Sequence, residues 1–210
     1  MSSRHNRFRS SRPALRRAPA IVSSALAVGA AAACGGRDPF APIARSQTVG
    51  PVALTLFPIS RVRAPYYPAL DLRFADPVQP AVGVTDLGLV PNFDVAFDVD
   101  ASGRIVLLPA KLLVSTAVVP RTGFQVSATR FDSLRSAPTG TYQTDSALRV
   151  TVGQTVVVQA QSTLCYRAGQ FFYAKLVVDN VNATTGGLAV RVVSNPNCGF
   201  RSFASGIPES

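Results

Sequence analysis

The sequence predicts an all-β fold, either an antiparallel β-sandwich or a barrel-like domain. Apolar residues after position 47 recur with a period of two, which is typical of strands that bury one face. The chain contains 16 prolines and 15 glycines, and many of them separate these runs at the short spacings found in sandwiches and barrels. The same region lacks the 3.6-residue period of an amphipathic helix.

In the first half, alternation predicts strands at residues 52–56, 70–74 and 93–99. In the third of these, apolar residues alternate with Asp94, Ala96 and Asp98, so we expect the aspartates to lie on a solvated face. The segment 100–103 predicts a hairpin turn before a strand at 105–108, because Gly103 tolerates a positive φ. The apolar run at 112–119 is rich in β-branched residues, which favours a further strand.

The second half repeats the pattern. Alternation predicts strands at residues 124–128, 148–152 and 156–160. Two longer runs, 172–178 and 188–192, flank a loop that contains Asn182 and two glycines, which is typical of a β-hairpin.

The first 33 residues differ from the rest of the chain. They carry six arginines and no acidic residue, followed by an apolar run at 18–33. A basic head, a short apolar segment and small residues at its end predict a secretory signal peptide. A retained membrane anchor is the alternative, but the run is shorter than the roughly 20 residues that span a bilayer.

The end of this segment, Ala31-Ala32-Ala33-Cys34, resembles the lipobox of bacterial lipoproteins. The resemblance implies cleavage before Cys34, a lipid on that cysteine, and a location in the cell envelope outside the cytoplasm. Because Gly35 follows the cysteine, it also implies the outer membrane in a cell that has one. An ordinary cleavage site beside an unrelated cysteine is the alternative. The domain prediction is a signal peptide at 1–33, a lipidated flexible tether at 34–47, and one β-rich domain at 48–210; a division into two β modules near 119–123 is the other option.

The net charge of +10 depends strongly on the predicted signal peptide. Removal of residues 1–33 leaves 15 basic and 11 acidic residues, a net charge of +4. This modest excess argues against a nucleic acid as the partner.

Three cysteines are present, and a lipid on Cys34 leaves Cys165 and Cys198. In an oxidising compartment we expect these two to form a disulfide. A zinc site is the competing use, but two cysteines without a histidine supply too few ligands.

The chain contains one histidine, His5, and it lies in the predicted signal peptide. The mature protein then has no histidine for a catalytic triad, a Cys-His pair or a histidine-ligated metal. We therefore expect no cofactor and no enzymatic activity.

Carboxylates are the remaining candidates for chemistry. Asp98 and Asp100 lie two residues apart, at a separation similar to that of a glycosidase pair, but a solvated strand face does not raise a carboxyl pKa. Asp98, Asp100 and Ser102 also resemble the start of a calcium loop, although Pro109 stands where the bidentate glutamate is required. Hairpin-turn chemistry explains the same residues.

Tyr66 and Tyr67 lie between two prolines and offer a recognition surface, or else they cap a sheet edge that the prolines protect. The sequence thus favours a cell-envelope lipoprotein with a non-catalytic binding or structural domain. Its expected partners are the membrane, through the lipid, and an envelope protein or polysaccharide. The alternatives are a histidine-free hydrolase or lyase that uses aspartate and arginine, and a calcium-stabilised adhesin-like domain.

Overall fold

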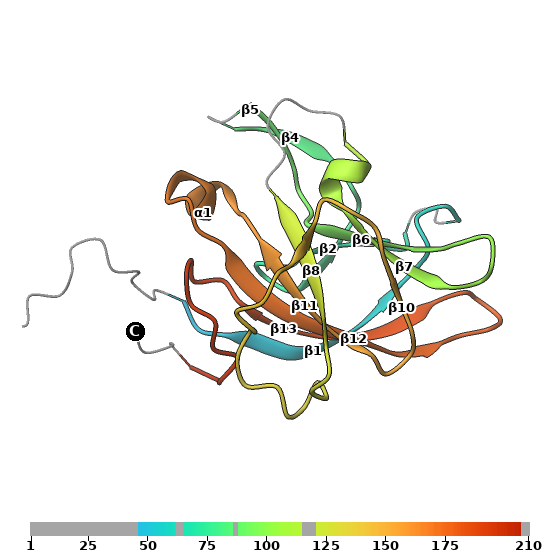
Figure 1. Ribbon diagram of the computed structural model, residues 1–210. Coiled ribbons are helices and arrows are strands. Elements are labelled where there is room, and N and C mark those ends of the chain that lie inside the picture. Colours follow the sequence, from blue (N-terminus) through green and yellow to red (C-terminus); the bar gives the residue numbers. More distant parts are fainter. Residues whose placement is uncertain (1–45, 62–64, 86–87, 115–120, 207–210) are drawn as a thin grey trace, which may run out of the picture. The chain divides into compact units, whose positions relative to one another are not determined.

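Two antiparallel sheets face each other in the computed structural model, which describes residues 46–61, 65–85, 88–114 and 121–206 (Figure 1). The larger sheet has six strands, in the spatial order β1 (Val49–Leu56), β13 (Leu188–Asn195), β12 (Phe172–Val181), β11 (Thr155–Ala160), β8 (Thr122–Ser127) and β9 (Gln143–Thr144). The smaller sheet has five, in the order β10 (Leu148–Val150), β7 (Ile105–Pro109), β6 (Val95–Val99), β2 (Ala69–Asp71) and β3 (Asp76–Val78).

A separate two-stranded ribbon, β4 (Val82–Thr85) and β5 (Gly88–Pro91), projects near the two helical turns of the fold (Figure 1). These turns are a 3₁₀ helix at Ala110–Leu112 and the five-residue α1 (Thr163–Arg167). Strands from both halves of the sequence share each large sheet, since β10 pairs with β7 and β1 pairs with β13.

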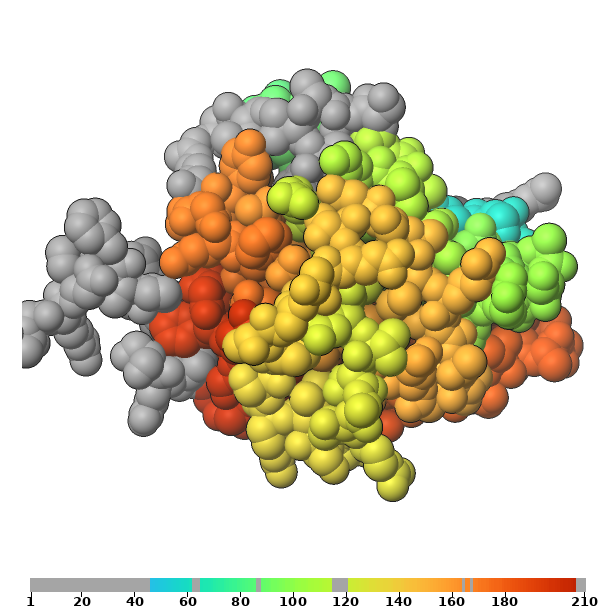
Figure 2. All heavy atoms as spheres, viewed as in Figure 1, coloured from blue at the N-terminus to red at the C-terminus, as the bar shows by residue number. Residues whose placement is uncertain are grey.

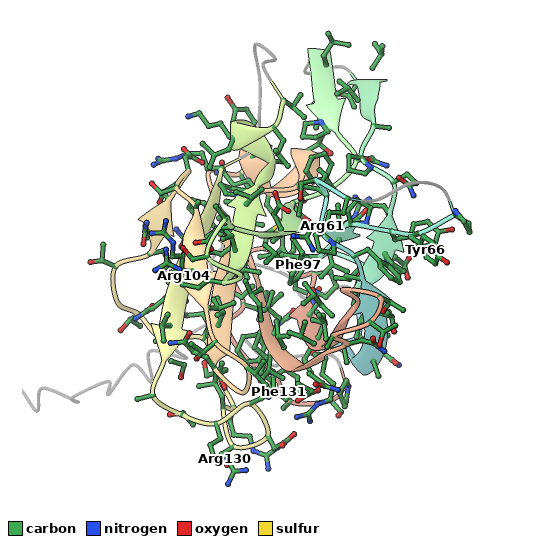
Figure 3. The ribbon with its side chains drawn as sticks, turned by 90° about the vertical axis from the view of Figure 1, so that its right-hand side faces the viewer. Arg61, Tyr66, Phe97, Arg104, Arg130 and Phe131 are labelled. Carbon is green, nitrogen blue, oxygen red and sulfur yellow. A yellow bond between two sulfur atoms is a disulfide. The ribbon has the colours of Figure 1, made fainter. Side chains whose placement is uncertain are left out.

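The main core lies between the two large sheets. The smaller sheet contributes Leu70, Phe97 and Leu107, and the larger sheet contributes residues such as Phe124 and Leu176, all at most 1% exposed. Figure 3 shows Phe97 among side chains in this interior. The all-β prediction is confirmed, and the arrangement is sandwich-like, because the two sheets stay separate and pack face to face.

Two predicted hairpins are present. In the β12–β13 pair, Val178 lies opposite Val190, and the connecting loop is held by Asn182, whose Oδ1 accepts hydrogen bonds from the backbone N–H groups of Thr184 and Thr185. The β6–β7 pair turns at Gly103, which has a φ of +77°. Both loops therefore use the residues that the sequence indicates.

Three expectations need correction. The run 70–74 does not remain a strand, because β2 ends at Asp71 and Phe74 is 51% exposed in the following turn. At 112–119, the described part is the end of the 3₁₀ helix and the turn after it, and residues 115–120 lie outside the described part. In β6 the second face is not solvated at Ala96, which is fully buried against Phe93 and Ala110.

The outer face of the larger sheet is also covered. Residues 128–142 lie across this face, as the yellow segment of Figure 2 shows, and bury Phe131 and Tyr142 against β11, β12 and β13. Lys175 anchors the segment, since its Nζ donates hydrogen bonds to the carbonyl oxygens of Phe131, at 2.6 Å, and Leu134, at 2.8 Å. Central strands of this sheet therefore bury side chains on both faces.

The predicted disulfide is present. Cys165 of α1 bonds to Cys198, which follows β13, with an S–S distance of 2.04 Å. Cys34, the predicted signal peptide at 1–33 and nearly all of the 34–47 tether lie outside the described residues. Within the described part of the chain, no helix has the length and apolar character needed to cross a membrane.

Candidate functional site

A pocket of about 290 Å³ lies at one end of the sandwich, where the space between the two large sheets opens. Thr122 and Phe172 form its wall on the side of the larger sheet, at neighbouring positions because both pair with Ala160 of β11. Asp71 and Asp94 form the wall on the side of the smaller sheet. The remaining wall comes from the β4–β5 ribbon and from the start of α1.

Backbone hydrogen bonds fix Asp94 at this position. Its N–H donates to the carbonyl oxygen of Leu70, at 2.9 Å, and its own carbonyl oxygen accepts from the N–H of Ala110, at 3.0 Å. In the side chain, Oδ2 accepts a hydrogen bond from the N–H of Leu72 at 2.8 Å. The second carboxyl oxygen, Oδ1, has no hydrogen-bond donor among the described residues.

Both pocket carboxyls have a raised pKa, and Asp71 contributes to the shift of Asp94. Burial, and to a lesser degree the nearby carboxylate of Asp71, raise the pKa of Asp94 to about 7, against the hydrogen bond from the N–H of Leu72 and the charge of Arg73. Burial also raises the pKa of Asp71, although Arg73 opposes the shift. A carboxyl whose pKa approaches neutrality is a recognised mark of functional sites.

Arg73 is the basic group of the pocket wall among the described residues. Its terminal nitrogen lies 3.8 Å from Oδ2 of Asp71, and its guanidinium stacks on Phe74 with 4.2 Å between the guanidinium carbon and the ring centroid. Arg73 therefore pairs with Asp71, and among the described residues it makes no ion pair with Asp94.

Several polar side chains of the pocket wall hold the wall itself in place. Asn92 joins the ends of the ribbon, because its Oδ1 accepts from the N–H of Ala81 and its Nδ2 donates to the carbonyl oxygen of Gln79. Ser162 caps α1 by accepting a hydrogen bond from the N–H of Cys165. The disulfide at Cys165 then ties this wall to the segment that follows β13.

Thr122 differs from these residues. It is 1% exposed and lines the pocket, yet its hydroxyl makes no hydrogen bond to any described residue. A hydroxyl that lines a pocket without a hydrogen bond to the protein is a natural contact for a ligand.

The alternation in the sequence predicts Asp94, Asp98 and Asp100 on one solvated face, and the structure separates them. Asp94 lines the pocket, whereas Asp98 accepts a hydrogen bond from Oγ of Ser60 at 2.6 Å and holds a neighbouring turn. The carboxyl pair of the site is therefore Asp71 with Asp94 rather than Asp98 with Asp100.

The calcium candidates Asp98, Asp100 and Ser102 belong to the hairpin instead. Oδ1 of Asp100 accepts from the backbone N–H groups of Ser102 and Arg104, and Oδ2 accepts from Nε of Arg104 and Nε of Arg149. The backbone hydrogen bond from Arg104 is the largest cause that lowers the pKa of Asp100 to about 2. Four donors, two of them cationic, leave this carboxylate without free lone pairs for a calcium ion.

Tyr66 and Tyr67 are 51% and 43% exposed and do not line the pocket. Tyr66 packs on Phe57 with 4.3 Å between ring centroids, and Figure 3 shows it at the periphery of the domain. A binding role for these tyrosines stays a prediction.

Sequence reasoning missed Asp71 and Thr122 as members of the site. Asp71 is separated by 23 positions from Asp94, and Thr122 lies on the other large sheet, so no spacing in the sequence links the three residues. No protein-family model matches the chain, and searches among curated proteins and among solved structures also find no match.

Proposed function

We propose that this protein is an envelope lipoprotein whose β-sandwich binds a small polar ligand in the Asp71–Asp94 pocket. One observation carries the proposal: Oδ1 of Asp94 and the hydroxyl of Thr122 line one pocket, and neither has a hydrogen-bond partner among the described residues. Such groups lower stability unless a partner satisfies them, which is the usual trade-off at a binding site. A concave pocket with a few convergent polar groups is also the usual form of a small-molecule site.

The lipid anchor rests on the sequence alone. The lipobox resemblance at Cys34 and the Pro- and Gly-containing tether would hold the domain at a membrane surface, within reach of solutes in the envelope. The intact mass of protein extracted from membranes, measured with and without reduction, tests this part. We expect a chain that lacks residues 1–33, is heavier by acyl groups, and gains two hydrogens on reduction. An unmodified or uncleaved chain would refute the anchor.

The binding part has its own test. A ¹H–¹⁵N correlation spectrum of the full chain is recorded with a panel of polyols, carboxylic acids, phosphates and amines. We expect at least one class to shift the amide resonances of Leu72, Thr122 and Ser162 in a saturable manner. If no member shifts these resonances, the pocket is not a binding site for small polar solutes.

A second function is favoured by one specific property of the pocket. Because burial raises the pKa of Asp94 to about 7 beside Asp71, this carboxyl could act as a general acid with Asp71 ionised. The second candidate is therefore a hydrolase or lyase that uses this carboxyl pair. Turnover of glycoside or ester substrates that disappears in D94N and persists in D98N would support it.

A further inference from the structure

We infer that the pocket binds a small hydroxylated ligand by its ammonium group, which lies against Asp94 and Asp71 while a ligand hydroxyl meets Thr122. This inference rests on the proposed function and names the class of ligand. Three observations on different parts of the pocket support it: the charge of the wall, the unpaired hydroxyl of Thr122, and the size of the cavity.

The charge of the wall favours a cation. Among the described residues that line the pocket, the titratable side chains are Asp71, Asp94 and Arg73. Arg73 lies 3.8 Å from Asp71 and acts on Asp94 only through its charge, which opposes the rise in the pKa of Asp94, so among the described residues Asp94 has no direct cationic partner. An ammonium in the pocket would supply this partner and would also relieve the repulsion between the two carboxylates.

Thr122 supplies independent evidence for a ligand, because it belongs to the opposite sheet. On β8 it shares a face with Phe124, which lies in the main core, so its side chain is directed between the sheets. It is 1% exposed and unpaired within the described part of the chain. A hydroxyl in this position can donate to or accept from a hydroxyl on the ligand.

The size of the pocket favours an organic cation over a metal ion. A volume of about 290 Å³ lies near the lower end of small-molecule sites. A calcium or magnesium ion contacts its oxygen ligands at roughly 2.0–2.6 Å and would fill only a small part of this space. A short amino-polyol or a single amino-sugar ring has both the volume and the hydroxyls that the wall can contact.

The test compares two probes that differ in one group. Glucamine carries an ammonium where sorbitol carries a hydroxyl, and an alkylammonium keeps its proton well above pH 8. Both are titrated into the full chain at pH 8 while the amide resonances of Leu72, Thr122 and Ser162 are followed. We expect a Kd for glucamine roughly tenfold or more below that for sorbitol, because the charged hydrogen bond is the difference between them.

Matched variants separate the site from the rest of the domain. D94N removes the charge with little change in shape and should abolish the preference for glucamine, and T122V should weaken both probes. The controls are D179N, an aspartate paired with Arg191 outside the pocket, and T155V, another buried threonine whose hydroxyl lacks a partner. Both controls should bind glucamine as the unchanged chain does.

A pH series adds a second readout. The preference for glucamine should decrease between pH 8 and pH 6, because Asp94 then takes up a proton and no longer pairs with the ammonium. The other described charged groups that line the pocket are Asp71, which would act in the same direction, and the guanidinium of Arg73, which lies against Asp71.

The failures of the two proposals are distinguishable. If sorbitol binds as tightly as glucamine, or if only an anionic solute shifts the pocket resonances, the ammonium inference is overturned and the proposed function stands. If D94N keeps the preference for glucamine, the inference is also overturned. If no solute of the whole panel shifts these resonances, the proposed function fails together with it.

Discussion

Asp94 and Asp100 lie at the two ends of β6 and have opposite surroundings. Asp100 accepts hydrogen bonds from two backbone N–H groups and two arginine side chains, and these hydrogen bonds hold its pKa near 2. Asp94 accepts one backbone hydrogen bond, faces the carboxylate of Asp71, and has a pKa near 7. One aspartate is thus fully satisfied by the fold, and the other is not.

This difference distinguishes a carboxylate that stabilises the fold from one that is available to a ligand. At the hairpin end, each oxygen of the aspartate helps to hold the turn or pairs with an arginine, so the carboxylate stabilises the fold where it lies. At the pocket end, the carboxyl remains costly to ionise and still faces an accessible volume. A group that the fold leaves unsatisfied beside a cavity is a better indication of a site than the residue type alone.

Removal of the disulfide should have the largest effect, because Cys165 lies in α1, whose first residue, Thr163, lines the pocket. Replacing both cysteines with serine should lower the free energy of unfolding by about 3–4 kcal/mol, as the bond closes a loop of 33 residues. Urea denaturation measures the loss. Hydrogen exchange should rise near α1 and stay unchanged in the β6–β7 hairpin; a uniform rise would show that the two ends are not independent.

D94N tests the pocket end directly. In the unfolded chain Asp94 titrates near 3.8, and in the folded protein near 7, so the folded state binds more protons across this interval. The free energy of unfolding should therefore fall as the pH rises from about 4 to 7, and D94N should remove this fall and gain about 1–3 kcal/mol at pH 8. Thermal unfolding at pH 5 and pH 8 measures it. A variant less stable than the parent at pH 8 would show that the ionised carboxylate is satisfied.

T122V and T155V compare two buried threonines, Thr122, whose hydroxyl lines the pocket, and Thr155, whose hydroxyl is buried without a partner away from the pocket. Because valine removes the hydroxyl and keeps a similar shape, each variant should change stability by at most about 1 kcal/mol. Chemical denaturation measures both. A much larger loss in T122V would indicate that its hydroxyl has a structural partner.

D100N should have the smallest effect. Asparagine retains the Oδ1 acceptor for the backbone N–H groups of the turn and loses the charge that pairs with Arg104 and Arg149, which lie 54% and 64% exposed. We expect a slight decrease in Tm at pH 7 that disappears as the pH falls toward 2, where the parent carboxylate also becomes protonated. An increase in Tm would contradict the assignment of Asp100 to the turn.

Local chemistry explains which predictions from the sequence succeeded. The β12–β13 hairpin follows from period-two alternation and from a loop with Asn182, and both properties act over a few residues. The predicted turn at Asp100–Gly103 is confirmed for the same reason. The strand prediction at 70–74 was wrong because the alternation continues past Asp71, where β2 ends. The chain turns there instead, and Ala75 takes a φ of +55°.

The sequence by itself determined the all-β class, the main hairpins and the cysteine pair, because alternation, turn residues and cysteine number are properties of short segments or of composition. It also supplies the lipobox resemblance at Cys34. Only the tertiary structure decided that Asp71, Asp94 and Thr122 share one pocket, since they come from separate strands on two sheets. It also decided that Asp94 has a raised pKa and Asp100 a lowered one, because the pKa of a carboxyl depends on the groups that packing brings around it.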